Sequence, residues 1–173
     1  LDRSPNGKRC AEKIVRHAAL FERLGGRDAV LEAAPTPQGD LRTVDVCAKD
    51  RPGLFSNIAG VFTLNNLDVK EAQIYTWRNH VALDAFLVAP PPDRLFEKEV
   101  FSRAERDLQE ALAGRLALDE ALKNKLAASR GSPARTALRE EGVRIDNETS
   151  SFFTIVEVIA YDRPGLLYQI TSA

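Results

Sequence analysis

One segment of this chain occurs twice, with the copies 112 residues apart. The first copy reads Val44-Asp45-Val46-Cys47-Ala48-Lys49-Asp50-Arg51-Pro52-Gly53-Leu54, and the second reads Val156-Glu157-Val158-Ile159-Ala160-Tyr161-Asp162-Arg163-Pro164-Gly165-Leu166. Each copy is an alternating apolar run, then a turn, then the start of an apolar stretch with helical spacing. A repeated strand–turn–helix unit predicts two related modules.

The composition is that of an ordinary globular protein of 173 residues, with room for one or two domains. A net charge of -1 gives no reason to expect nucleic acid or an anionic membrane as a partner. No apolar run reaches the length of a membrane span. Cys10 and Cys47 have no metal-site spacing and fit a reducing compartment, so we expect a cytoplasmic protein. The chain has no methionine, so we expect it to begin inside a longer gene product.

The first copy lies within a series of predicted elements. Apolar residues at helical spacing over 11–24 predict a short helix, and the prolines of 33–40 indicate a linker, so residues 1–40 are expected to be an N-terminal helix and linker. The alternation over 41–48 predicts a half-buried strand. A helix is expected to start near Pro52 and to stop at Asn65-Asn66.

The elements that follow complete a predicted β-α-β-β-α-β order over 41–148. Strands are expected over 67–78 and 80–88, joined by a hairpin turn at Arg78-Asn79. Helices follow over 94–113 and 115–128, the second within a helical insertion of about 115–140. Val143 and Ile145 mark a short strand, which we expect to be the last strand of the first module.

Residues 152–173 open the second copy, which contains one strand and part of a helix. Such a piece cannot bury a core by itself. We therefore expect an incomplete second module, whose strand over 152–160 pairs with the first sheet or with a neighbouring chain.

This order, with Asp-Arg-Pro-Gly-Leu after the first strand, resembles the ACT domain, a small ferredoxin-like ligand-sensing module. The sequence is more similar to the C-terminal tandem ACT region of the bacterial uridylyltransferase/uridylyl-removing enzyme, which modifies the nitrogen signal protein PII. The residues that carry the resemblance, within roughly 10–173, are 50–56, Ala59-Gly60, 75–78, 82–84, 144–147 and 162–168. The resemblance implies an α+β, ferredoxin-like fold with an antiparallel sheet.

The resemblance also implies which parts of the enzyme this chain lacks. The family's nucleotidyltransferase centre has a Gly-Ser followed by an Asp-x-Asp metal pair, but no Asp-x-Asp follows Gly131-Ser132. Its hydrolytic centre has a His-Asp doublet, and neither His17 nor His80 precedes an aspartate. We therefore expect no catalytic centre, metal or cofactor in this chain, and magnesium in the parent enzyme. The resemblance further implies glutamine as the sensed ligand and PII as a partner through the parent.

The repeated turn has the chemistry to bind an amino acid. The first amide groups of a helix lack partners, and with the helix dipole they suit a carboxylate. Gly53 lets a ligand approach the main chain, and Asp50 can accept a hydrogen bond from an ammonium group. The residue spacing does not select glutamine over other amino acids. The candidate ligand-binding residues of the two copies are Asp50, Arg51, Pro52, Gly53, Leu54, Asn57, Asp162, Arg163, Pro164, Gly165 and Leu166.

Other interpretations of the same residues remain open. Asp-x-Pro-Gly is also a good helix start, with the aspartate as a cap. The module could serve only for dimerisation through its sheet edges, which would make a homo-oligomer, or for contact with PII. The pair could also regulate a different host enzyme. A complete small enzyme is disfavoured, because no set of His, Cys and carboxylate residues converges.

Overall fold

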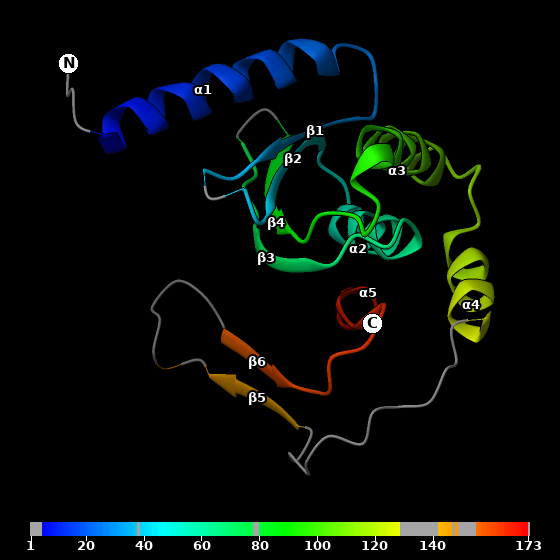
Figure 1. The fold of residues 1–173 in the computed structure, drawn as a ribbon. Helices are drawn as coiled ribbons and strands as arrows, with labels where there is room; N and C mark the ends of the chain where they lie inside the picture. The colour runs from blue at the N-terminus through cyan, green and yellow to red at the C-terminus, as the bar shows by residue number, and fades with distance from the viewer. Residues whose placement is uncertain are drawn as a thin grey trace.

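The computed structural model describes residues 5–37, 39–77, 80–128, 142–146, 148 and 155–172. Its centre is a four-stranded antiparallel sheet in the order β1-β2-β4-β3 (Figure 1). The strands are β1 (Ala29–Pro35), β2 (Arg42–Lys49), β3 (Val69–Gln73) and β4 (Val81–Val88). The predicted α+β class with an antiparallel sheet of ferredoxin-like type is confirmed.

Helices cover both faces of this sheet (Figure 1). On one face, α2 (Leu54–Leu64) and α3 (Glu97–Leu112, after the 3-10 turn η1 at Arg94–Phe96) enclose the main core. On the other face, α1 (Pro5–Leu24) covers a smaller apolar cluster. The smaller cluster consists of Leu20, Leu24, Val30, Cys47, Val81 and Leu83. Residues 44–48 are consequently buried without interruption, so the expectation of a half-buried strand is wrong.

The strand that completes this sheet is β1, and the expectation that Val143 and Ile145 supply it is wrong. In β1, Leu31 lies opposite Val46 and Ala33 lies opposite Val44. The linker predicted over 33–40 from Pro35, Pro37 and Gly39 overlaps the end of this strand. Pairing with β2 and burial against both helical layers override that local preference. Pro35 is tolerated because it ends an edge strand.

Gly142–Asp146 forms β5, which pairs with β6 (Ile155–Ile159) in a separate two-stranded sheet. The expected strand over 152–160 is therefore present, and its partner is β5. Val143 lies opposite Val158, which is the pairing of Leu31 with Val46 moved along the chain by 112 residues. The repeat thus includes the preceding strand, and β5 stands to the second copy as β1 stands to the first.

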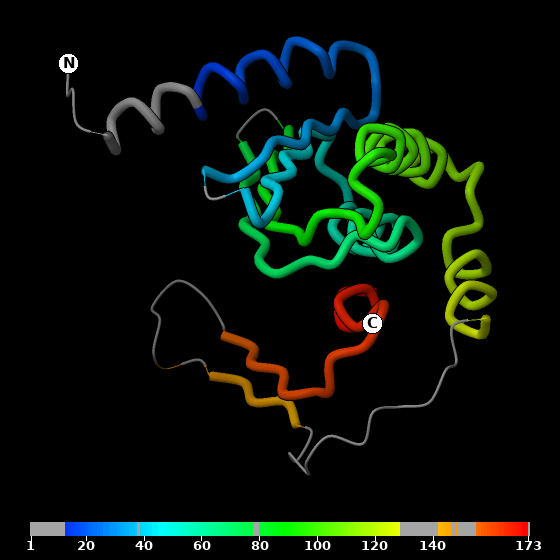
Figure 2. The backbone as a smooth tube through the Cα atoms, viewed as in Figure 1, coloured from blue at the N-terminus to red at the C-terminus, as the bar shows by residue number. Residues whose placement is uncertain are grey.

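The second copy ends in α5 (Leu166–Thr171), which packs on α2 and near α4 (Leu118–Ala128). The backbone path in Figure 2 shows the β5–β6 hairpin away from the first sheet and α5 beside α2. A Cβ atom on Gly60 would lie 2.7 Å from Leu118 Cδ2 and 2.9 Å from Tyr168 Cδ2. The Tyr168 hydroxyl donates a hydrogen bond to Asp119. Gly60 is therefore a point of close approach between α2 and α5.

Several predicted elements have the expected positions. The helices over 11–24, 94–113 and 115–128 are present as α1, α3 and α4, although α1 begins earlier, at Pro5. Asn66 has the left-handed conformation expected of a helix stop, with φ of 57°. The predicted hairpin turn at Arg78-Asn79 and the part of the predicted helical insertion after Ala128 lie outside the described residues.

Candidate functional site

The first repeated turn joins β2 to α2 as a type II β-turn. The Leu54 amide donates to the Arg51 carbonyl oxygen at 3.1 Å, and Gly53 has φ of 78° and ψ of 5°. These values match the third residue of a type II turn, with Pro52 before it at the position that favours proline. The helix therefore begins at Leu54, after the turn and two residues later than Pro52, near which its start was predicted. The reason is that left-handed Gly53 interrupts the helical path.

The second turn has the same geometry. The Leu166 amide donates to the Arg163 carbonyl oxygen at 3.1 Å, and Gly165 has φ of 82° and ψ of 3°. The sequence repeat is therefore also a repeat of backbone conformation.

Neither turn uses its aspartate as a helix cap. Gly53 and Gly165 occupy the N-cap positions of α2 and α5, and neither helix has a side-chain cap hydrogen bond. Within the described residues, the Asp50 carboxylate accepts no hydrogen bond. Capping by the aspartate therefore does not explain the motif.

The start of α2 leaves two neighbouring main-chain donors available. The Asn57 amide donates to the Gly53 carbonyl oxygen at 3.0 Å, as does the Ser56 hydroxyl at 2.9 Å. The Leu54 and Asn57 amides are thus both used in hydrogen bonds. The amides of Phe55 and Ser56, which lie between them, have no acceptor in the part of the chain that the structure describes. These two donors point along the helix axis at its positive end, where an anion is stabilised.

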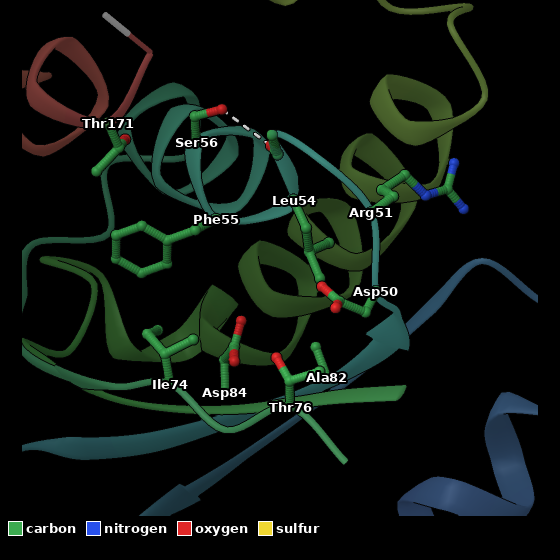
Figure 3. A pocket seen from close by; sticks show the side chains of 11 residues that line it. Asp50, Arg51, Leu54, Phe55, Ser56, Ile74, Thr76, Ala82, Asp84 and Thr171 are labelled. Carbon is green, nitrogen blue, oxygen red and sulfur yellow. Dashed lines mark hydrogen bonds between the residues drawn. The ribbon is translucent and has the colours of Figure 1, made fainter. Parts of the chain in front are cut away.

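The same turn opens onto a cavity of about 390 Å³. Figure 3 shows its lining, which comes from the turn, from the start of α2, from the residues after β3, from β4 and from α5. The lining residues are Asp50, Arg51, Gly53, Leu54, Phe55, Ser56, Ile74, Thr76, Ala82, Asp84 and Thr171. The volume is within the range of small-molecule sites.

Asp84 is a cavity residue that the candidate set does not include. It lies on β4 between Ala82 and Phe86, on the sheet face that packs against the helices, and only 1% of its surface is exposed. Burial raises the pKa of its carboxyl group to about 6, the hydrogen bond from the Tyr75 amide lowers that pKa, and the nearby Asp50 charge raises it. The sequence signal that could have revealed it is a charged residue at an apolar position of an alternating strand.

Three of the predicted site residues do not present their side chains to this cavity. The Arg51 guanidinium points away from it (Figure 3) and donates to the Leu112 carbonyl oxygen at 3.0 Å and to Asp28 Oδ1 at 2.8 Å. These contacts tie the turn to the end of α3 and lower the pKa of Asp28, chiefly through the Arg51 hydrogen bond. Asn57 donates to the Gly53 carbonyl oxygen at 2.8 Å, and neither Asn57 nor Pro52 lines the cavity.

The second turn borders another cavity, of about 580 Å³, between the second copy and the first. Its lining includes Asp162, Arg163, Pro164, Gly165, Leu166, Leu167 and Ile170 from the second copy, and Ala59, Thr63 and residues 66–72 from the first. Arg163 donates to Gln169 Oε1 at 3.3 Å. The helix behind this turn, α5, is only 6 residues long.

The two cavities are related by the repeat. Ala59 of α2 lines the second cavity, and Thr171 of α5, which occupies the equivalent position 112 residues later, lines the first. Each copy therefore contributes the same helix position to the cavity of the other copy.

Three other features of the described residues bear on function. Within them, no group of three or more His, Cys, Asp or Glu residues is placed to hold a metal ion. No helix in the same ranges is long and apolar enough to cross a membrane. Cys47 is a free, buried thiol, and burial raises its pKa to about 11.

Comparison with known proteins gives one consistent answer. A protein from Rhodopseudomonas palustris is 36% identical over 94% of this chain, and one from Rhodospirillum rubrum is 34% identical over 92%. Both are named bifunctional uridylyltransferase/uridylyl-removing enzyme. This chain is homologous to a part of that enzyme family. The resemblance to the uridylyltransferase/uridylyl-removing enzyme is therefore confirmed.

The homology to the uridylyltransferase/uridylyl-removing enzymes covers a small part of those proteins. The chain spans 17 to 18% of the length of the two relatives named above, and 15% of the relative from Gluconobacter oxydans, to which it is 34% identical. No protein-family model matches the chain. No solved structure matches it either.

Proposed function

We propose that this chain is a regulatory ACT region of a PII uridylyltransferase/uridylyl-removing enzyme and that it binds a free amino acid, glutamine, beside the first repeated turn. The observation that carries the proposal is the pair of unpartnered amides of Phe55 and Ser56 at a cavity that also contains the Asp50 carboxylate. The name of the relatives supports the enzyme, and the family resemblance supports glutamine.

The proposed mode of binding follows from the charges at the turn. The ligand carboxylate accepts hydrogen bonds from the Phe55 and Ser56 amides, where the dipole of α2 adds a favourable field. Its ammonium group lies toward Asp50, across the same cavity. Gly53 has no side chain to obstruct the approach of the carboxylate to the helix start. The second turn repeats the backbone geometry, and we propose Asp162 to Leu166 as a second, related site.

Regulation by this ligand requires different affinities for two conformations of the protein. The first cavity includes Thr171 of α5, so an occupied site favours the arrangement in which α5 packs on α2.

We propose that the modules follow the repeated hairpins, the first starting with β1 and the second with β5. Catalysis, magnesium and recognition of PII would belong to the parent enzyme, and the free thiol of Cys47 fits a cytoplasmic location.

Isothermal calorimetry with a panel of amino acids tests the proposal. We expect saturable binding of glutamine to this chain, weakened by Asp50→Asn and unchanged by Asp40→Asn, which removes an exposed carboxylate outside the cavity lining. Absence of binding for every amino acid would contradict the proposal. The same titration on the complete parent enzyme, with both transferase and removing activities measured, gives the sign of regulation.

A second candidate function is association through the β5–β6 hairpin. Val143 is 66% exposed and Ile145 is 63% exposed, although the equivalent residues of β1 face the main core. An open apolar sheet face of this kind is suited to pairing with another protein surface, either a second copy or PII. Light scattering with and without glutamine separates the two functions. A ligand-independent dimer that binds no amino acid would favour association.

A further inference from the structure

We propose that Asp84 is the specificity-determining residue of the first cavity and that it recognises the ammonium group of the ligand. This inference rests on the proposed amino-acid binding and adds a residue that the repeated motif does not contain. It restricts the ligand to molecules that have a free amino group as well as a carboxylate.

Asp84 lies where a carboxylate disfavours folding, so a purely structural role does not explain it. Its neighbours on the same face of β4, Ala82 and Phe86, belong to the main core. A carboxylate at such a position is usually paired, because transfer of a charge from water to the protein interior is unfavourable.

The other buried charged residues of the described chain are paired. Asp45 Oδ2 lies 2.5 Å from Arg16 Nη2, and Arg42 forms an ion pair with Glu97. Asp84 takes part in no ion pair with a described residue, and its hydrogen-bond donor there is the Tyr75 amide, at 3.4 Å. That distance is beyond the usual range of N–H···O bonds, so the charge of Asp84 is weakly compensated by the protein.

The Asp84 side chain is directed into the cavity. Figure 3 shows its carboxylate between Ile74 and Thr76, facing the helix start, with the Asp50 carboxylate on the same side of the space. The cavity therefore has two acidic groups on its sheet and turn side and two main-chain donors on its helix side. An α-amino acid zwitterion has the complementary arrangement, with an ammonium group beside a carboxylate.

A cation in this cavity would stabilise the ionised carboxyl group of Asp84, which is otherwise unfavourable there. Burial and the Asp50 charge both disfavour the ionised carboxyl group, and a ligand ammonium would favour it. Raised pKa values of this kind, with a stated cause and a cavity position, are more frequent at functional sites than elsewhere. Asp50 is exposed, so water can solvate its charge when no ligand is bound. Asp84 is buried, so its charge depends on the ligand ammonium group for compensation.

Calorimetry with matched ligands and variants tests the assignment. The probes are L-glutamine, N-acetyl-L-glutamine and 4-carbamoylbutanoic acid, the last being glutamine without its amino group. The variants are Asp84→Asn, which keeps the shape and removes the charge, and Asp40→Asn, a control that makes the same change at an exposed carboxylate outside the cavity lining. Thermal unfolding of each variant establishes that it is folded before the titration.

We expect Asp84→Asn to weaken glutamine binding by about 10- to 100-fold and Asp40→Asn to change it by less than about threefold. The two analogues without an ammonium group should bind the unchanged chain at least about tenfold more weakly than glutamine. Equal glutamine affinity for Asp84→Asn and the unchanged chain would overturn the assignment and leave amino-acid binding intact. No binding of any amino acid to the unchanged chain would overturn the proposed function, and this assignment with it.

Discussion

Asp84 places a carboxylate where its strand otherwise has apolar side chains, and Gly53 gives the adjacent turn a backbone conformation that other residues adopt with difficulty. Gly53 suits the left-handed position that its turn requires, whereas a charged Asp84 disfavours the folded state. Function commonly retains such residues, since natural proteins need only enough stability to fold. Each residue therefore has a measurable effect on stability as well as on binding.

The effect of Asp84 depends on pH in a direction fixed by its pKa. Burial raises that pKa from 3.8 to about 6, so between these values the folded chain binds more protons at this residue than the unfolded chain. Protonation of Asp84 therefore stabilises the folded chain fully below about pH 3.8, and this stabilisation is lost as the pH rises through about 6. We expect Asp84→Asn to raise the free energy of unfolding by roughly 1 to 3 kcal/mol above pH 7, and by less near pH 4.

Urea unfolding of both chains at several pH values measures this difference. A difference between the two chains that stays constant from pH 4 to pH 8 would show that the charge of Asp84 is not the cause.

Gly53 allows a second test at the same scale. Its φ of 78° is in the left-handed region, so a Cβ atom is unfavourable there even though its nearest contact would be 3.6 Å away. We expect Gly53→Ala to lower the free energy of unfolding by roughly 1 to 2 kcal/mol. Gly26→Ala is the control, because a Cβ at that position meets nothing within 4 Å. Equal effects of the two substitutions on chemical unfolding would contradict the role of the turn conformation.

Among the elements, β1 and β5 occupy equivalent places in the two hairpins but have different surroundings. Leu31 of β1 is in the main core, whereas Val143, its equivalent in β5, is mostly exposed. The same strand position is thus covered by helices in one copy and open in the other. The two residues form an internal comparison within one chain.

We expect Leu31→Ala to lower the free energy of unfolding by roughly 2 to 4 kcal/mol, because it leaves a cavity in the core. Val143→Ala should change it by about 0.5 kcal/mol or less, as is usual for surface substitutions. Thermal or urea unfolding of the two variants provides the comparison. A large loss of stability with Val143→Ala would mean that the face of β5 is covered in solution.

The sequence predicted most elements but not how they combine. The strands that became β2 and β4, the helices α3 and α4, and the left-handed Asn66 follow from local patterns of apolar residues and from turn chemistry. The strand β1 does not, because Ala29 to Pro35 has little strand preference and depends on pairing with β2. The burial of both faces of β2 likewise depends on α1, so the alternating pattern of β2 itself could not predict it.

The candidate site was predicted in part for the same reason. The repeated turn gave the backbone donors and Asp50, since these are consecutive in sequence. Asp84 comes from another strand and reaches the cavity only through the β2–β4 pairing. Asn57 and Arg51 show the opposite error, because they are close to the turn in sequence but their side chains make other contacts in the structure.

In the whole molecule, the two copies meet through α2 and α5, and each lines the cavity of the other. Gly60 permits this approach, because the Tyr168 ring and Leu118 lie where its Cβ would be. We expect Gly60→Ala to increase the hydrogen exchange of α5 amides by several-fold. Overlap is unfavourable by roughly 1 to 3 kcal/mol, and a gain in helix preference of about 1 kcal/mol offsets part of it.

Hydrogen exchange resolved by segment measures this effect, with Gly26→Ala again as the control. Unchanged exchange of α5 in Gly60→Ala would indicate that α5 does not depend on its contact with α2.

Amide chemical shifts of this chain during titration with L-glutamine test amino-acid binding beside the first turn most directly. We predict saturable shifts, largest at the Phe55 and Ser56 amides, with smaller shifts at Thr171 across the cavity. A spectrum that glutamine and other amino acids leave unchanged, or shifts that avoid Phe55 and Ser56, would contradict the account.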